Sequence, residues 1–141
     1  MGQSPPSSSV STNEGDTPLL TTGEFGERYP ALIRYTSKPL KMASKNDVLI
    51  TVVGNVGGVN LGADCAIGRS VAAIRLSDDI DQLFLYYFLK SNSERLAQKS
   101  RGAIQKIIRK PQLEDIELPD FSIIEQKRIA AILDKANEIE Q

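Results

Sequence analysis

The chain has 141 residues, of which 40% are hydrophobic and 25% are charged, the composition of one globular domain. It contains no histidine and one cysteine, Cys65, so chemistry based on histidine or on paired thiolates is largely excluded, although carboxylates remain able to hold a metal. Cys65 lies among small and apolar residues and is predicted to be a buried hydrophobe rather than a reactive thiol. The longest apolar runs, residues 48–53 and 83–89, are far shorter than the ~20 residues that span a bilayer. With no signal-like segment at its start, we expect a cytoplasmic protein without a cofactor.

The net charge of −1 conceals an uneven distribution. Residues 1–30 carry one Lys or Arg against four Asp or Glu, and residues 113–141 carry three against eight. In between, residues 31–77 carry six basic against two acidic side chains, and residues 78–112 carry seven against four. A basic middle between acidic ends is compatible with a phosphate-binding face, although segregated charge more often only solvates a surface.

The first half of the chain reads as a polar segment followed by short strands. Residues 1–18 are rich in Ser, Pro, Gly and Asn, which indicates either a flexible tail or an ordered loop laid over the domain. Residues 47–53 (DVLITVV) predict a buried strand, and residues 54–58 (GNVGG) predict a tight turn without the Lys-Ser/Thr of a phosphate-gripping loop. Further short strands are predicted at residues 59–61, 63–67 and 70–76. Glycines between them favour a compact, strongly bent sheet over a parallel doubly wound one.

Residues 80–90 predict a helix, because apolar side chains recur there at positions i, i+3, i+4, i+7 and i+8. These side chains are Ile80, Leu83, Phe84, Tyr87 and Phe88. Asp78 and Asp79 suit the first turn of such a helix. A second helix is predicted over residues 93–99, and a last strand over residues 113–119.

The C-terminal segment predicts one more helix. Ser122 and Glu125 have the spacing of a capping box, in which each side chain satisfies a backbone N–H of the other. The helix that follows reaches the end of the chain, and an apolar stripe runs along it. The stripe comprises Ile129, Ile132, Leu133 and Ala136. It either packs on the domain of its own chain or pairs with a helix of a partner or a second copy.

Residues 99–110 are the strongest nucleic-acid candidate, because they contain five basic side chains, Gln105 and no acid. Lys and Arg neutralise phosphates, whereas Gln and Arg also read base edges in the major groove. The alternative is a solvated face with Ile104, Ile107 and Ile108 turned into the core.

One short pattern in the sequence is similar to that of a nuclease. Pro119 and Asp120, followed by residues 125–127 (EQK), imitate the PD…E-x-K pattern of metal-dependent nucleases. That chemistry needs two carboxylates on one metal, usually from adjacent strands. Only four residues separate Asp120 from Glu125, and Glu125 already has a part in the capping box, so no catalytic residue is predicted.

Several segments together resemble the specificity-subunit family of type I restriction-modification systems. Residues 2–7 (GQSPPS) resemble the G-x-S-P opening of the family. Residues 47–50 (DVLI), followed by Gly54 and Gly57, resemble its G-D-V-L strand and loop. The departure here is that Asn46 stands where a glycine is typical before the aspartate.

The resemblance continues through the second half of the chain. Residues 85–89 (LYYFL) resemble the Y-L-Y-Y-x-L helix of the family, and residues 101–105 (RGAIQ) resemble the loop before its last strand. The most specific segment, residues 118–134, resembles the junction into its long spacer helix. Residues 120–122 (DFS) stand where a second proline is usual, but the capping box preserves the helix start.

The resemblance implies a mixed α+β target-recognition domain over residues 1–121, with short, strongly twisted, β-helix-like strands and a central helix pair. Residues 122–141 would begin a spacer or dimerisation helix. Full subunits of the family resemble two such domains joined by antiparallel spacer helices, on which methyltransferase subunits dock and supply the S-adenosylmethionine chemistry. One domain with about one helix implies a fragment or a half-subunit that dimerises, and a start at Met1, without the family's usual preceding element, favours a fragment.

The predicted function is therefore non-catalytic recognition of one half of a bipartite target in double-stranded DNA. The expected partners are methyltransferase subunits, indirectly the restriction subunit, and a second recognition domain or copy through the C-terminal helix, but no membrane. The predicted DNA contacts are Arg34, Lys38, Asn55, Asn60, Arg69, Arg101, Gln105 and Lys106, and the predicted partner-helix residues are Ile129, Ile132, Leu133 and Ala136. The basic members would mostly hold phosphates, while Asn55, Gln105 and Arg69 are candidates for reading bases. A protein-interaction fragment or decoy without DNA affinity is the main alternative.

Overall fold

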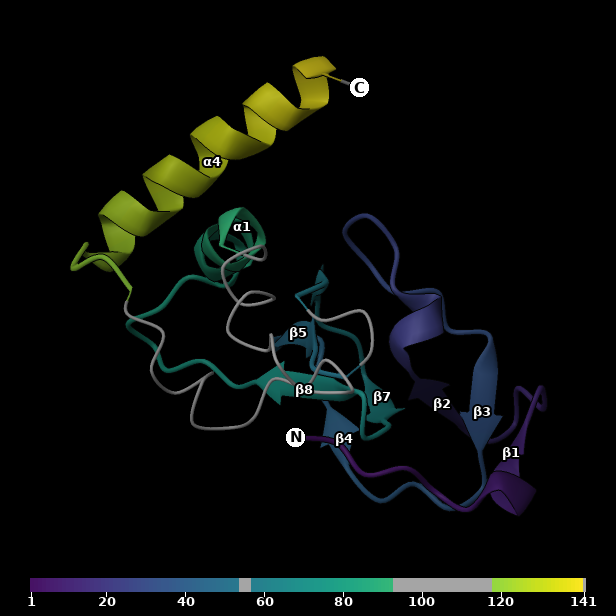
Figure 1. Cartoon of the computed structure of the whole chain (residues 1–141). Coiled ribbons are helices and arrows are strands. Elements are labelled where there is room, and N and C mark those ends of the chain that lie inside the picture. Colours follow the sequence, from purple (N-terminus) through teal and green to yellow (C-terminus); the bar gives the residue numbers. More distant parts are fainter. Residues whose placement is uncertain (54–56, 93–117, 141) are drawn as a thin grey trace, which may run out of the picture.

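The structure is a computed structural model that describes residues 1–53, 57–92 and 118–140 (Figure 1). Its strands are β1 (Val10–Ser11), β2 (Thr17–Leu20), β3 (Arg34–Thr36), β4 (Met42–Ala43), β5 (Val48–Thr51), β6 (Val59–Leu61), β7 (Cys65–Ile67) and β8 (Val71–Ile74). Two short 3-10 turns are η1 (Ser7–Ser9) and η2 (Thr22–Glu24), and the α-helices are α1 (Gln82–Ser91) and α4 (Ile123–Glu140). The predicted α+β class is confirmed.

A five-stranded sheet has the strand order β1-β3-β2-β7-β4, in which only the β2–β7 pair is parallel. Its first members come from the polar N-terminal segment, so of the two predicted alternatives the ordered one is observed. Hydroxyl groups hold this part of the sheet where apolar side chains are scarce: Ser9 Oγ and Thr36 Oγ1, both buried, lie 2.8 Å apart.

A three-stranded antiparallel sheet has the order β6-β5-β8. The predicted strand at 47–53 is observed as β5, and β6 has its predicted bounds. The strands β7 and β8 are shorter than the predicted 63–67 and 70–76. All four residues of β5 are buried, because one face of the strand meets α1 and the other meets the five-stranded sheet.

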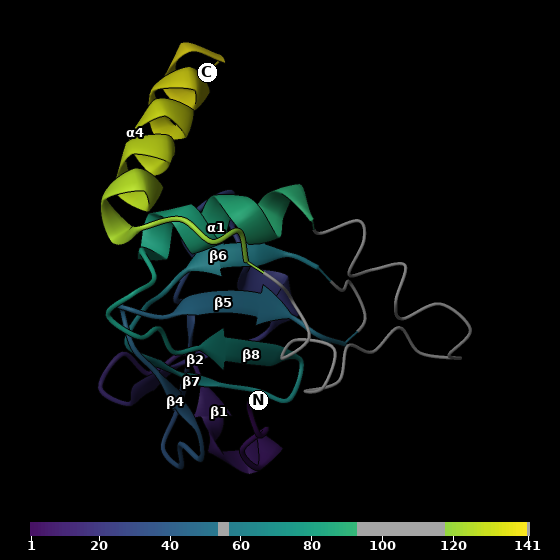
Figure 2. The same ribbon diagram turned by 90° about the vertical axis from the view of Figure 1, so that its left-hand side faces the viewer.

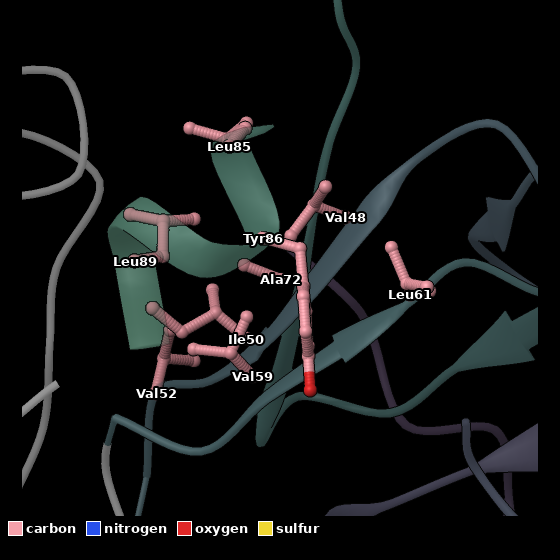
Figure 3. Close-up of a cluster of buried hydrophobic side chains, with 9 residues drawn as sticks. All are labelled: Val48, Ile50, Val52, Val59, Leu61, Ala72, Leu85, Tyr86 and Leu89. Carbon is pink, nitrogen blue, oxygen red and sulfur yellow. The ribbon is translucent and has the colours of Figure 1, made fainter. Parts of the chain in front are cut away.

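Two clusters of buried side chains follow from the alternation along β5. Val48 and Ile50 point to α1 and join Leu85, Tyr86 and Leu89 in the larger cluster (Figure 3). Leu49, which points the other way, joins residues of β2, β4, β7 and β8, among them Cys65. Cys65 is fully buried, as predicted, and burial together with the nearby charges of Asp64 and Asp47 raises the pKa of its thiol to about 11.

Helix α1 lies across the three-stranded sheet (Figure 2). The predicted helix at 80–90 begins two residues later than expected, because Asp81 is its N-cap and its side chain accepts the N–H of Phe84 at 3.0 Å. The aspartates at 78 and 79, which were expected in the first turn, precede it. The predicted helix at 93–99 and residues 113–117 of the predicted last strand lie outside the described residues.

Helix α4 begins beside the start of α1 and projects beyond the sheets (Figure 2). The Ser122 hydroxyl accepts the N–H of Glu125 at 3.2 Å and donates to Oε1 of Glu125 at 3.0 Å. The capping residues are thus the predicted ones, but the glutamate side chain bonds to the serine hydroxyl instead of its backbone N–H. Among the described helices, none has the length and the apolar character needed to cross a membrane.

Candidate nucleic-acid interface

The turns at one end of the two sheets lie close together, and we call residues 21–25, 57–58 and 68–70 the loop end. Ile50 pairs with Val59 and Thr51 pairs with Val71, so the end of β5 lies beside the starts of β6 and β8. The C-terminal end of α1 points the same way (Figure 2). Residues 53 and 57 therefore lie at this end, and α1 ends toward it.

The loop end is also joined to the five-stranded sheet. Gly68 N–H donates to the carbonyl of Leu20 at 3.0 Å, and Thr22 N–H donates to Oγ of Ser70 at 3.3 Å. The end of β2 and the turn between β7 and β8 are thereby fixed to each other.

The N-terminal G-x-S-P segment positions the turn that carries Arg69. Gly2 N–H donates to the carbonyl of Val71 at 2.9 Å, and a Cβ at Gly2 would clash with the carbonyl oxygens of the residues at 67 and 68. The hydroxyl of Ser4 accepts the N–H of Arg69 at 3.1 Å. Arg69 itself is exposed. A residue type without a side chain at position 2 is needed because the backbones approach so closely.

Arg34 lies at the start of β3, next to the end of β2, and its side chain is 54% exposed. Its Nε lies 3.1 Å from Oε1 of Glu24, whose side chain is 2% exposed. The other carboxylate oxygen of Glu24 accepts the hydroxyl of Thr21 at 2.6 Å. Sequence reasoning missed Glu24, because one acid in an acidic segment gives no sign that it is buried.

The other predicted DNA contacts are not gathered here. Lys38 is exposed but follows the opposite end of β3. Asn60 is fully buried in β6: its amide accepts the N–H of Gly26 at 3.0 Å and donates to the carbonyl of Gly26 at 2.8 Å. In this structure the Asn60 side chain holds the 26–28 segment against the sheet and is not presented to a ligand. The predicted contacts Asn55, Arg101, Gln105 and Lys106 lie outside the described residues.

Helix α4 meets the rest of the chain through polar side chains. Buried Gln126 accepts the N–H of Asp81 at 2.8 Å and donates to the carbonyls of Asp79 at 2.9 Å and Phe121 at 3.0 Å. The only apolar side chain that α4 buries fully within the described residues is Ala130.

A second polar contact of α4 lies two turns further on. Oδ1 of Asp134 accepts both the Tyr87 hydroxyl and the Arg28 guanidinium at 2.5 Å. The hydrogen bond from Tyr87, and then Arg28, lower the pKa of Asp134 against the opposing effect of burial. Burial and the bond to Asp134 raise the pKa of Tyr87 to about 12. We call Arg28, Tyr87 and Asp134 the polar clamp. In the sequence, the only indication of the polar clamp was Tyr87, which carries a hydroxyl among the apolar side chains of the predicted helix.

The predicted partner-helix residues are exposed to different extents on α4. Ile132 is 63% and Leu133 40% exposed, Ala136 is exposed, and Ile129 is half-buried. An open groove of about 490 Å³ separates α1 from α4 and is lined mainly by apolar side chains. These include Phe84, Phe88, Phe121, Ile129 and Leu133. Ile129 and Leu133 thus line the groove between α4 and α1, whereas Ile132 and Ala136 are exposed, so the chain itself covers the stripe only in part.

The residues of the nuclease-like pattern are arranged for capping. Asp120 and Glu125 are both exposed, and Glu125 bonds to Ser122. In the part of the chain that the structure describes, no three Cys, Asp or Glu side chains are grouped so as to hold a metal ion.

Comparison with known proteins gives one consistent result. The family model described as the type I restriction modification DNA specificity domain matches residues 1–141. A Methanocaldococcus jannaschii protein described as a specificity subunit of the type I restriction enzyme MjaX is 38% identical over 99% of this chain.

Solved structures agree with this match. The HsdS subunit from Thermoanaerobacter tengcongensis superposes with a TM-score of 0.85 and 34% identity over 98% of the chain. A chain from a structural study of type I restriction-modification complex assembly gives a TM-score of 0.88 at the same identity and coverage. The chain spans about a third of the length of these relatives: 33% of the first, 34% of the second and 35% of the third. The chain thus belongs to the type I restriction modification DNA specificity domain family.

Proposed function

We propose that this chain reads one half of a bipartite DNA target as a recognition domain of a type I restriction-modification specificity subunit, without carrying out chemistry itself. The observation that carries the proposal is that two exposed arginines lie at or beside the loop end: Arg69 in the turn between β7 and β8, and Arg34 at the start of β3, next to the end of β2. Exposed cations on adjoining elements are suited to the phosphates and base edges of one face of a duplex.

Within this proposal the basic residues Arg69, Arg101 and Lys106 hold phosphates, with Lys38 at the margin of the surface. Asn55 and Gln105 read base edges. Asn60 is left out of the set because its amide is buried and bonded to Gly26.

The same proposal gives α4 its partners. Its exposed stripe pairs with a helix of a second recognition domain or of a second copy, which the threefold greater length of the relatives leaves room for. Methyltransferase subunits bind near this helix and bring the methyl-transfer chemistry, and the restriction subunit joins through them.

The test is selection from a randomised duplex pool, with and without a cognate methyltransferase subunit, at two salt concentrations. Enrichment of a short half-site is expected. Arg69→Ala should weaken binding to all sequences and reduce the salt slope by about one, because one phosphate contact is lost. Lys45→Ala is the control, since Lys45 is exposed but precedes β5 at the opposite end of its sheet. A pool without enrichment in either condition would favour a decoy or protein-interaction fragment.

A further inference from the structure

Arg34 is held in a way that its neighbour Arg69 is not. Its Nε faces a carboxylate whose side chain is 2% exposed, while the arginine side chain is itself 54% exposed. The second oxygen of that carboxylate, Oε2 of Glu24, accepts the hydroxyl of Thr21, and the Glu24 carbonyl accepts the N–H of Ala31 at 2.8 Å. The guanidinium therefore forms an ion pair with a buried carboxylate through Nε, while more than half of the arginine side chain is exposed.

The geometry of the guanidinium decides what the free edge can do. Arginine carries five N–H donors in one plane. Contact through Nε leaves Nη1 and Nη2, for which the described residues provide no hydrogen-bond partner. Two parallel N–H groups at the end of an arginine match O6 and N7 of guanine in the major groove, which is the commonest specific contact to a base.

The side chains around Arg34 are also of the kind that can contact DNA bases. Tyr29 and Ile33, on the same connection between η2 and β3, are 61% and 63% exposed. Large apolar side chains beside an arginine can contact the thymine methyl group or the sugar edge of a duplex. The connection ends at β3, whose start lies next to the end of β2 and so next to the turn that carries Arg69.

A structural salt bridge is the competing explanation, since a buried carboxylate needs a positive charge nearby. A lysine would supply that charge equally well, but it presents no pair of coplanar donors. We infer that Arg34 reads one guanine of the half-site through Nη1 and Nη2, and that Glu24 is the positioning residue that holds it. This inference rests on the proposed DNA-recognition function.

The experiment uses the full chain with its methyltransferase partner and the half-site selected by the wild type. Binding is measured to that half-site and to the set of duplexes in which each base pair is replaced in turn. Arg34→Lys should lose about 5- to 150-fold on the selected half-site and lose its preference at one guanine only. The salt slope should stay unchanged, because the positive charge is kept.

Two further variants distinguish recognition of a base by Arg34 from a purely structural role of its ion pair. Glu24→Gln keeps the shape and an acceptor for Thr21 but weakens the hold on Arg34, so it should flatten the preference at the same guanine. Arg75→Lys is the matched control, because Nε of Arg75 also faces a buried carboxylate, that of Asp47, but beyond the far end of β8; it should leave every base preference as it was. Thermal midpoints of all variants are recorded beside the binding data.

Three results would overturn the inference. If Arg34→Lys binds like the wild type while Arg34→Ala loses affinity evenly with a smaller salt slope, Arg34 holds a phosphate. If both variants bind normally but melt earlier, the ion pair is only structural. If the wild type selects no half-site at all, the proposed function fails together with the reading of guanine, a result recognisable before any variant is made.

Discussion

The two α-helices of the described structure are attached to the molecule by opposite kinds of contact. Helix α1 buries Phe84, Leu85, Tyr86 and Leu89, most of them against the three-stranded sheet (Figure 3). Helix α4 is attached through Gln126 and Asp134, and turns most of its larger apolar side chains outward. The first helix belongs to the core, whereas the second is held on the surface of a domain that is already complete.

The difference has a physical consequence. Apolar burial is strong but non-directional, so α1 needs only shape and volume to match. Hydrogen bonds are weaker in net free energy but directional, so they specify the orientation of α4 while leaving its apolar stripe free for another helix.

The largest expected effect on stability comes from removing an apolar side chain from the buried face of α1. Leu89→Ala should lower the free energy of unfolding by about 2–5 kcal/mol, because the fully buried side chain leaves a cavity. Leu133→Ala on α4 removes the same atoms from a side chain that is 40% exposed and should cost much less. Urea denaturation measures both, and equal losses would contradict the contrast between the helices.

An intermediate effect is expected at Gln126. Gln126→Ala leaves the N–H of Asp81 and two carbonyl groups without their partner, at a cost of about 1–3 kcal/mol. Hydrogen exchange should accelerate in α4 and little in β5. The neighbouring exposed Arg128→Ala is the control. Faster exchange throughout β5 would show that α4 is part of the core after all.

The polar clamp should respond to pH at both extremes. The pKa of Asp134 is lowered in the folded chain. The stabilising contribution of its carboxylate to the free energy of unfolding is therefore complete above the ordinary aspartate pKa of about 3.9, and it is lost as the pH falls below that value. The pKa of Tyr87 is raised to about 12. The stabilising contribution of its protonated hydroxyl to the free energy of unfolding is therefore complete below a pH of about 10, the ordinary tyrosine pKa, and it is lost as the pH rises toward 12.

Spin labels on exposed Lys135 and Ser37 would report this change as a distance distribution. The distribution should stay narrow between the two limits and broaden beyond them. Tyr87→Phe should abolish the alkaline broadening, and Asp134→Asn should abolish the acidic one. Broadening that persists in both variants would assign the pH response to other groups.

The smallest effect on stability is expected on the free stripe. Ile132→Lys should change the free energy of unfolding by less than about 0.5 kcal/mol, because the side chain is 63% exposed. Self-association at high concentration, followed by sedimentation equilibrium, should fall in the same variant if the stripe pairs with a second copy. A loss of stability comparable to that of Leu89→Ala would mean that the stripe packs on its own chain.

The parts of the fold that were predictable are those with a strong local pattern. The apolar run of β5, the helical spacing of α1 and the capping pair Ser122 and Glu125 each encode their structure within a few residues. Of the five-stranded sheet only β7 was predicted, because contacts such as that between Ser9 and Thr36 join residues 27 positions apart.

The candidate site was predictable in composition more than in arrangement. Arg34 and Arg69 were predicted as DNA contacts, and both are exposed in the structure, but contact with DNA stays a prediction. Asn60, in the strand predicted at 59–61, was predicted as a DNA contact, whereas its partner Gly26, 34 positions away, keeps its amide in the core. For the same reason the docking face of α4 could not be foreseen: Asp134 binds Arg28, 106 positions earlier in the chain.

The attachment of α4 also sets a length scale for whatever lies beyond it. Gln126 and Asp134 lie two turns apart on α4, so the two contacts together fix the direction of the helix axis. The 18 residues of α4 extend about 27 Å, so a tilt of about 10° at the docking face moves the far end by about 5 Å, more than the rise of one base pair. A few hydrogen bonds on one helix face can thus determine where the far end of α4 and its exposed apolar side chains lie relative to the two sheets.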